Sequence, residues 1–549
     1  MNLIKDAWIP VIRASGKARI APWQIAEQDD PVLELDALRP DFQGALYQFL
    51  IGLLQTAFAP QDHDEWLEFW EESPDVELLR TRFDSLECAF NLICSDGPAF
   101  MQDYALPKGE KKKIPISSLL IEAPGNKTSQ ENLDHFIKRD TVKHICAACA
   151  AMALFTLQTN APSGGNGHRV GLRGGGPLTT LVLPPEKTTL WRKLWLNILD
   201  SEDLAKYPGK VTSDIFPWMG PTRASYQKME GKVKRYINGG VSTTPEDTHA
   251  LQMYWGMPRR IRIESPTDLV GTCDVCGDQN VTLLNGYRTG VWGVDYIGEW
   301  VHPLTPYRFD LNKENPPLSL KGQQGGLGYR HWLGLMLSDP YNGDSAAKVT
   351  KSYLEKRGRD ISGQRVARLW CFGFDMDNMK ARCWYDNTLP IFALDPIQRE
   401  NVLAWAGEFV NAARDVAENL RRQVKAAWFR RPEDVKGDMS AVQQEFWQKS
   451  ETDFYRILNQ LCALPGSQRQ LPVEFYDEWR NIIKSLAYRV FDAWALESST
   501  EDLDLKRIVT ARDELRKKLN KSKSMKILIE KSKPQKEGEN GPTAAVPIS

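Results

Sequence analysis

The sequence has no apolar run long enough to cross a bilayer, and its positive and negative charges nearly cancel. Its most apolar run, residues 45–60, contains Gln48 and Gln55 and is too short for a membrane span. The start, MNLIKDAWIPVIR, lacks an apolar stretch of signal-peptide length. A formal net charge of −1 excludes a globally basic protein that coats DNA, but it allows local basic patches. We therefore expect a cytoplasmic protein that does not enter a membrane.

The sequence also lacks the common motifs of catalysis. We find no HExxH, no GxSxG, no Walker loop and no array of histidines like that of an HNH nuclease. The seven histidines are scattered along the chain. The turn that contains Asp375 and Asp377 could hold a magnesium ion, but a single acidic turn is more often only solvated. The sequence therefore predicts a protein that is not an enzyme, and a metal-dependent nuclease using these two aspartates is the alternative.

The chain mixes strand-like and helical segments, and its length of 549 residues corresponds to roughly three to four domain-sized units. Apolar residues make up 42% and charged residues 26% of the chain, which is typical of a globular protein with large cores. Residues 1 to about 110 mix short extended runs with helices, among them a buried helix at 45–58. Residues 394–520 contain four amphipathic segments separated by Pro, Gly and Ser breaks, which indicate a four-helix bundle. Residues 521–549 are predicted to be a basic, disordered tail.

Two pairs of cysteines indicate a metal site. The chain has nine cysteines and no secretion signal, so thiols or metal ligands are expected in place of disulfides. Cys146 and Cys149 in CAAC, like Cys273 and Cys276 in CDVCG, have the spacing that lets two thiolates reach one tetrahedral ion. Together they predict a structural zinc site that joins two distant segments. Two alternatives are that the CAAC pair consists of buried helix cysteines, or that His144 replaces one ligand.

A glycine-rich stretch follows the first cysteine pair. Seven of the thirteen residues from Gly164 to Gly176 are glycine, and His168, Arg169 and Arg173 lie among them. Glycine permits positive φ and a close approach of a ligand to the backbone, and the interleaved side chains are donors suited to an anion. The stretch therefore predicts a loop that presents its backbone to a charged partner. The alternative is a flexible surface loop.

Several motifs, taken in order, resemble the CasA family, the large subunit of the type I-E CRISPR surveillance complex Cascade. They are MNLIKDAWIPV, the stretch from CAAC through APSGGNGHRVGLRGGGPLTT, WGMPRRIRI, CDVCG and the C-terminal helical segments. The resemblance reaches to about residue 520 and implies an α+β protein with two domains: a mixed α/β domain over residues 1–393 that holds the zinc, followed by a four-helix bundle over residues 394–520. It also implies a non-catalytic subunit that reads the protospacer-adjacent motif of duplex DNA through the minor groove. Such a subunit promotes strand opening and R-loop formation, and it helps to recruit the effector nuclease-helicase.

The resemblance also implies a set of DNA-binding residues. Carried over by position or by neighbourhood, this set is Gly164, Gly165, Asn166, Gly167, His168, Arg169, Arg288, Asn378 and Met379. Asn166 stands where a relative has glycine, and Met379, in the turn that wedges the duplex open, stands where glutamine is common. The family's basic contact falls on Val291, so Arg288 is a substitute for it. An unbranched apolar side chain at the wedge can still insert between base pairs.

The expected partners are double-stranded target DNA, CRISPR RNA, other Cascade subunits and the effector nuclease-helicase. The polar segment 121–140 would contact the guide RNA and a neighbouring subunit. Basic residues at 108–113 and 506–536 would contact phosphates without regard to sequence. A protein scaffold held together by zinc is a further alternative to this function.

Overall fold

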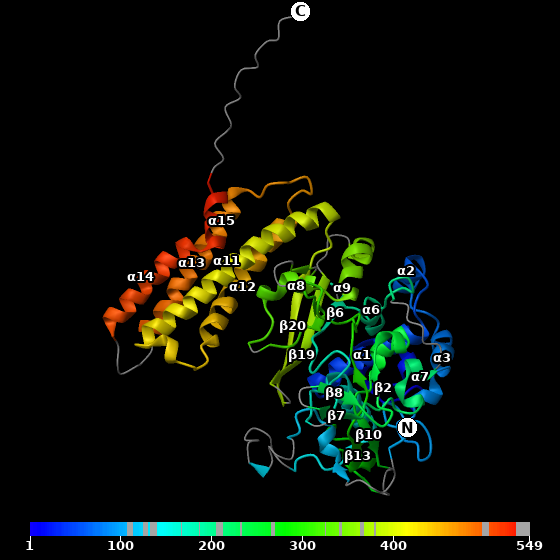
Figure 1. The fold of residues 1–549 in the computed structure, drawn as a ribbon. Coiled ribbons are helices and arrows are strands. Elements are labelled where there is room, and N and C mark those ends of the chain that lie inside the picture. Colours follow the sequence, from blue (N-terminus) through cyan, green and yellow to red (C-terminus); the bar gives the residue numbers. More distant parts are fainter. Residues whose placement is uncertain are drawn as a thin grey trace, which may run out of the picture. The chain divides into compact units, whose positions relative to one another are not determined.

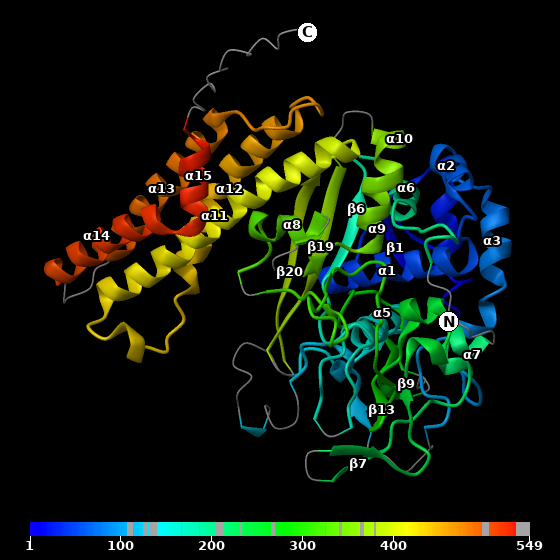
Figure 2. The same cartoon turned by 45° about the horizontal axis from the view of Figure 1, so that its top comes forward.

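Figure 1 and Figure 2 show a computed structural model of the chain, which forms two compact units. The N-terminal unit comprises Met1–Leu327 and Gly334–Ala393, and the helical unit comprises Gly328–Leu333 and Leu394–Ser549. The structure describes residues 1–533 except 107–112, 125–129, 132–139, 166, 186, 205–211, 231–232, 265–268, 324, 337, 340–342, 363–366, 378–379 and 497–503. Asn166, the predicted wedge Asn378-Met379 and residues 534–549 therefore lie outside the described residues, as do most of the predicted contacts at 108–113 and 121–140.

Helix α1 (Pro40–Ala57) lies in the core of the N-terminal unit, which confirms the predicted buried helix. Its residues between Asp41 and Gln55 are almost all buried. The ring of Phe49 meets five other rings edge-on, with centroids 5.4 to 6.0 Å away, namely those of Trp8, Phe90, Phe100, Phe155 and Trp255. Edge-to-face aromatic pairs are favourable beyond the apolar area that they bury. This cluster therefore holds α1 against segments that are far apart in the sequence.

The strands of the N-terminal unit form several small sheets. Five antiparallel groups are β2-β1-β3 (Gly16–Ile20, Ile9–Arg13, Val32–Leu35), β10-β13-β4 (Arg260–Ile263, Gly286–Gly290, Ile114–Pro115), β11-β12-β5 (Val270–Gly271, Val281–Leu284, Ile145–Cys146), β20-β19-β6 (Lys380–Ile391, Ala367–Asp377, Thr179–Leu183) and the hairpin β7-β8 (Gln227–Glu230, Val233–Tyr236). Two more groups are β16-β15-β18-β17 (Leu318–Ser319, Tyr307–Arg308, Asp344–Ser345, Ser338–Asp339) and the parallel pair β14-β9 (Asp295–Tyr296, Ser242–Thr243). The helices among them include α2 (His63–Glu71), α3 (Val76–Asp84), α5 (Ala147–Asn160), α6 (Leu190–Trp195), α7 (Thr212–Ile215), α9 (Lys348–Ser352) and α10 (Gly358–Ser362). The predicted α+β class is confirmed.

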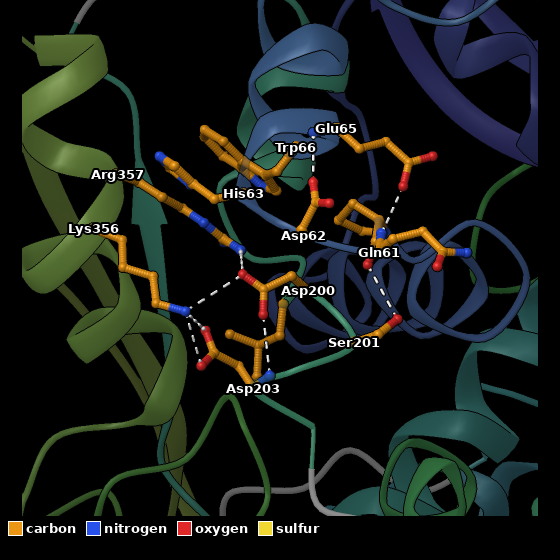
Figure 3. Close-up of polar contacts among 12 residues, drawn as sticks. Gln61, Asp62, His63, Glu65, Trp66, Asp200, Ser201, Asp203, Lys356 and Arg357 are labelled. Carbon is orange, nitrogen blue, oxygen red and sulfur yellow. Dashed lines mark hydrogen bonds and ion pairs between the residues drawn. The ribbon is translucent and has the colours of Figure 1, made fainter.

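A buried polar cluster ties α2 to the turn at 200–203 and to η8 (Tyr353–Arg357), a turn of π-helix between α9 and α10 (Figure 3). The Arg357 guanidinium lies 4.4 Å above the Trp66 ring and 3.9 Å from the Asp200 carboxylate. Lys356 pairs with Asp203 at 3.0 Å. Among the described residues, no hydrogen-bond acceptor meets the Arg357 nitrogens, and burial lowers the pKa of this guanidinium to about 10. Arg357 is therefore held in the core chiefly by charge attraction and by its contact with the indole.

The helical unit consists of α11 (Pro396–Trp428), α12 (Ser440–Cys462), α13 (Val473–Leu496), α14 (Leu505–Lys521), α15 (Lys523–Lys531) and the segment Gly328–Leu333. Helix α11 contacts each of the other four helices. Tyr329 enters this core from the earlier part of the chain and stacks on Phe454 with centroids 4.3 Å apart. Its hydroxyl forms a hydrogen bond of 2.9 Å with Ser450. The predicted C-terminal helical region is present, and it includes a short segment that the sequence assigned to the preceding domain.

Helix α15 lies in the stretch that the sequence assigned to a disordered tail. Met525 and Leu528 are fully buried, and α15 contacts both α11 and α13. The Ser522 hydroxyl accepts a hydrogen bond from the Met525 N–H and caps the helix. Burial of two apolar side chains offsets the surplus of lysine that suggested disorder. In the described part of the chain, no helix is both long enough and apolar enough to cross a membrane.

Candidate functional site

The four predicted metal ligands meet in space. The sulfur atoms of Cys146, Cys149, Cys273 and Cys276 all lie within 4.8 Å of one another, and three of these side chains are buried. The Cys146 and Cys276 sulfurs are 3.7 Å apart. Four sulfurs at about 2.3 Å from a tetrahedral zinc ion would lie about 3.8 Å apart. The donor set and its spacing therefore fit a four-thiolate metal site.

Backbone pairing brings the two cysteine segments together. Strand β5 pairs with β12 so that Cys146 lies opposite Leu283, and Cys146 then caps α5 by accepting a hydrogen bond from the Cys149 N–H. The Asp274 carboxylate accepts hydrogen bonds from the backbone N–H groups of Lys143 and His144 at 2.7 and 2.8 Å. His144 thus supports the cluster through its backbone, and four cysteines complete the group without it. The predicted alternative of two isolated helix cysteines does not describe this arrangement.

The thiols of the cluster perturb one another. Hydrogen bonds from the Cys146 and Cys149 thiols hold the pKa of Cys273 well below its ordinary value. Hydrogen bonds with Cys146 and Cys273, together with burial, raise the pKa of Cys149. Cys273 is therefore the thiol of the cluster whose deprotonation its neighbours favour. A cation at the centre would favour the thiolate form of all four side chains and release their protons.

The seven glycines of the glycine-rich stretch divide into packed positions and one open position. A Cβ atom at Gly171 would lie 2.8 Å from the Thr159 carbonyl oxygen, and one at Gly176 would lie 2.6 Å from the Met376 side chain. Clashes or tight contacts would also arise at Gly164, Gly167, Gly174 and Gly175. Only at Gly165, which is exposed and has a φ of +77°, would a Cβ atom meet no described atom within 4 Å. Six glycines are thus required for packing, while Gly165 presents bare backbone to solvent.

The packed glycines fix the loop at both ends. The Trp292 N–H donates a hydrogen bond of 2.6 Å to the Gly167 carbonyl oxygen, and Val291 and Trp292 cover the Gly167 Cα. The Arg259 guanidinium lies beside Gly164 and donates a hydrogen bond to the Pro162 carbonyl oxygen. These anchors come from segments more than ninety positions along the chain. The motif WGMPRRIRI contains Arg259, but nothing in the sequence marks Arg259 or Trp292 as an anchor of this loop, because that role depends on contacts between distant segments.

Two of the side chains expected to bind an anion, Arg169 and Arg173, make contacts with other residues of this chain. Arg169 donates hydrogen bonds to the side chain and the carbonyl oxygen of Ser225, stacks over Trp292 and lies 3.5 Å from Asp295. Arg173 is buried, and its guanidinium donates a hydrogen bond of 2.6 Å to Gln48. Burial lowers the pKa of Arg173 to about 10. The expectation that Arg173 offers a donor to an external anion is therefore wrong, because its hydrogen bonds are made inside the core.

The predicted basic contact Arg288 lies on β13, directly opposite Arg262 on β10. Its side chain is 12% exposed and forms an ion pair of 2.7 Å with Glu264. Val291, the exact family position, is instead exposed and packs beside Gly167. Contact of Arg288 with DNA would require release of its ion pair, whereas Val291 already lies at the loop.

The predicted wedge turn joins two long paired strands. Strands β19 and β20 remain paired as far as Asp377 and Lys380, the residues that flank Asn378 and Met379 (Figure 2). Arg382 donates a hydrogen bond of 2.8 Å to the Asp375 carboxylate. Gly176 packs on Met376 of the same hairpin. The glycine-rich stretch therefore connects Val291 and Trp292 at one end with the β19-β20 hairpin at the other.

These features define a class of protein. Its members have an α+β unit with a cysteine cluster and an exposed loop around Gly165, which we call the glycine loop, followed by a helical unit. Comparison with solved structures gives the same architecture. CasA of Thermus thermophilus is 17% identical with a TM-score of 0.65, covering 95% of this chain and 100% of that chain. Thermobifida fusca Cse1 is 16% identical with a TM-score of 0.67, covering 94% of this chain and 98% of that chain. A chain of a CRISPR RNA-guided surveillance complex is 15% identical with a TM-score of 0.67, covering 94% and 99% respectively.

The sequence model of the family described as CRISPR-associated protein Cse1 matches residues 2–490. This chain belongs to the Cse1 family. The resemblance inferred from the sequence motifs is thereby confirmed.

Proposed function

We propose that this chain is the large, non-catalytic subunit of a type I-E CRISPR RNA-guided surveillance complex, or Cascade. In this role it assembles with CRISPR RNA and other Cascade subunits, and it recognises the motif beside the target in duplex DNA. It then promotes strand opening and helps to recruit the nuclease-helicase. Family membership supports the assignment to the complex. The observation that carries the DNA-binding role is the open, positive-φ backbone at Gly165.

Gly165 suits a narrow groove for steric reasons. The minor groove is about 6 Å wide and displays a degenerate pattern of acceptors and donors. A backbone without a side chain can enter where a Cβ and its substituents would collide with the groove walls. The anchors at Gly164 and Gly167 hold this backbone in place before DNA arrives, so little conformational freedom is lost on binding.

The connection from the glycine loop to the β19-β20 hairpin supports a role in strand opening. In this proposal the turn at 378–379 inserts between base pairs. The packing of Gly176 on Met376 would then fix the distance between this turn and the glycine loop. Unstacking costs a few kcal/mol per base step, which additional contacts to the opened DNA offset. In this proposal Met379→Ala slows strand opening, measured by fluorescence of a 2-aminopurine base beside the motif, more than it weakens initial binding. Equal effects on the two steps would contradict the wedge.

The decisive test of the DNA-binding role replaces Gly165 with phenylalanine. We expect the assembled complex to lose its preference for a duplex that carries the motif, while assembly with CRISPR RNA is retained. Gly16→Phe is the matched control, because Gly16 also has positive φ and no atom within 4 Å of an added Cβ, but lies at the start of β2, away from the glycine-rich stretch in sequence. Unchanged preference in the Gly165 variant would refute minor-groove reading.

We further propose that the cysteine cluster holds a structural zinc ion through Cys146, Cys149, Cys273 and Cys276. A four-thiolate site leaves no open coordination position, so zinc would stabilise the fold and would not activate water. Elemental analysis of the purified chain should give about one equivalent of zinc. Substantially less than one equivalent would count against the site.

The alternative of a metal-dependent nuclease draws no support from the described residues. Asp375 is nearly buried and its carboxylate is bound by Arg382, which also lies 3.9 Å from Asp377. A metal ion bound by these two carboxylates would have to compete with the Arg382 guanidinium. In our proposal, replacing both aspartates with asparagine leaves DNA cleavage by the full system intact, and loss of cleavage would favour the nuclease.

A further inference from the structure

The hairpin β7-β8 carries two exposed basic residues at opposed positions. Lys228 on β7 and Arg235 on β8 lie directly opposite each other, and both are exposed. Like charges at directly opposed positions of an antiparallel pair destabilise it, because their side chains start about 5 Å apart. The ten residues 227–236 contain four Lys or Arg and one Glu. The hairpin thus presents two exposed positive charges at opposed positions of its strands.

The base of this hairpin is joined to the anchors of the glycine loop. The buried Ser225 donates its backbone N–H to the Trp292 carbonyl oxygen at 3.2 Å and its hydroxyl to the Gly293 carbonyl oxygen at 2.6 Å. The same Ser225 receives two hydrogen bonds from Arg169. Thus one residue at the foot of the hairpin binds both the glycine loop and the segment that covers Gly167.

Asp295 makes a second connection. Its carboxylate accepts hydrogen bonds from Gln227 at 3.2 Å and from Tyr236 at 3.0 Å, which are opposed residues of β7 and β8. It also lies 3.5 Å from the Arg169 guanidinium. The hairpin is therefore set at a defined position relative to the glycine loop by side chains that contact both.

We propose that the β7-β8 hairpin is a second DNA contact, at which Lys228 and Arg235 bind backbone phosphates of the duplex beside the adjacent motif. This proposal rests on the proposed reading of the minor groove by Gly165. A loop that enters the minor groove brings the flanking phosphates close to elements fixed beside it, and cations there bind without regard to sequence. The hairpin thus supplies affinity, and the glycine loop supplies motif preference.

The test measures duplex binding by the assembled complex over a range of salt concentrations. The variant carries Lys228→Gln and Arg235→Gln, and the control carries Lys5→Gln and Lys17→Gln, which remove the same charge elsewhere on the N-terminal unit. Each phosphate contact contributes about 0.9 to the steepness of log K against log salt. Between 1 M and 0.1 M salt, one such contact therefore strengthens binding by about eight-fold. We expect the hairpin variant to lose about 1.8 from this slope on duplexes with and without the motif. The ratio of affinities for the two duplexes should stay unchanged, as should binding by the control.

Three results would overturn the proposal: an unchanged slope, an equal change in the control, or failure of the variant to assemble with CRISPR RNA. The last would show that the hairpin belongs to an interface within the complex. Failure of the proposed function itself looks different, because the unmodified complex would then show no preference for the duplex with the motif.

Discussion

Gly165 and Gly167 form a matched pair that tests how the glycine loop is held. Their φ angles are +77° and +80°, so alanine at either position suffers the same backbone penalty of about 1–2 kcal/mol. Their surroundings differ. A Cβ atom at Gly165 meets nothing within 4 Å, whereas one at Gly167 would lie 2.9 Å from the Cβ of Val291. Overpacking adds about 1–3 kcal/mol, so Gly167→Ala should destabilise the loop by about 2 kcal/mol more than Gly165→Ala.

Hydrogen exchange at the Trp292 N–H reports this difference directly, because that group donates to the Gly167 carbonyl oxygen. A difference of about 2 kcal/mol in local opening corresponds to about 30-fold faster exchange. We expect this acceleration in Gly167→Ala relative to Gly165→Ala, measured on the isolated chain by mass spectrometry. Equal exchange in the two variants would show that the anchor at Trp292 does not hold the loop, and our account of the packed glycines would be wrong.

Three further predictions concern stability. Cys276→Ser should abolish the retention of zinc and lower the melting temperature, because structural zinc contributes folding free energy. A strong chelator added to the unmodified chain should have the same effect. A melting temperature that is insensitive to the chelator would contradict this prediction. Burial and the nearby arginines hold the pKa of His331 at about 3, so the unfolded chain takes up a proton below pH 6.5 that the folded chain does not. The free energy of unfolding should therefore fall by about 1.4 kcal/mol per pH unit between pH 6 and 4 on account of this group, and His331→Gln should remove that share in urea titrations; parallel pH profiles for the two proteins would refute it. Asp200→Asn should cost about 3 kcal/mol in urea unfolding by leaving the Arg357 guanidinium unpaired in the core, and adding Arg357→Met should recover most of that loss because it removes the unpaired charge; a double variant no more stable than Asp200→Asn would contradict our view of that cluster.

The sequence alone determined those features that depend on local pattern. The two-residue spacing of each cysteine pair indicated a metal site, since neighbouring thiolates reach one ion whatever the surrounding fold. The apolar periodicity between residues 396 and 519 predicted helices, because each helix of that region buries one of its faces. The ordered series of motifs identified the family. Each cysteine pair, each helical segment and each single motif lies within one continuous stretch of the sequence, so it can be recognised without knowledge of the fold.

The tertiary structure decided how distant segments share a position. Pairing of β5 with β12 placed the two cysteine pairs together, and the sequence could not distinguish this from two isolated pairs. Residues 328–333 join the helical unit and Met525 is buried in it because apolar side chains from elsewhere complete their surroundings. The same dependence explains the error about Arg173, which meets Gln48 inside the core, and it shows that Arg288, whose contact with DNA stays a prediction, is paired with Glu264. The role of a glycine or an arginine can be assigned only when its neighbours in space are known. Of the seven glycines, Gly165 alone is exposed and has open space around its Cα.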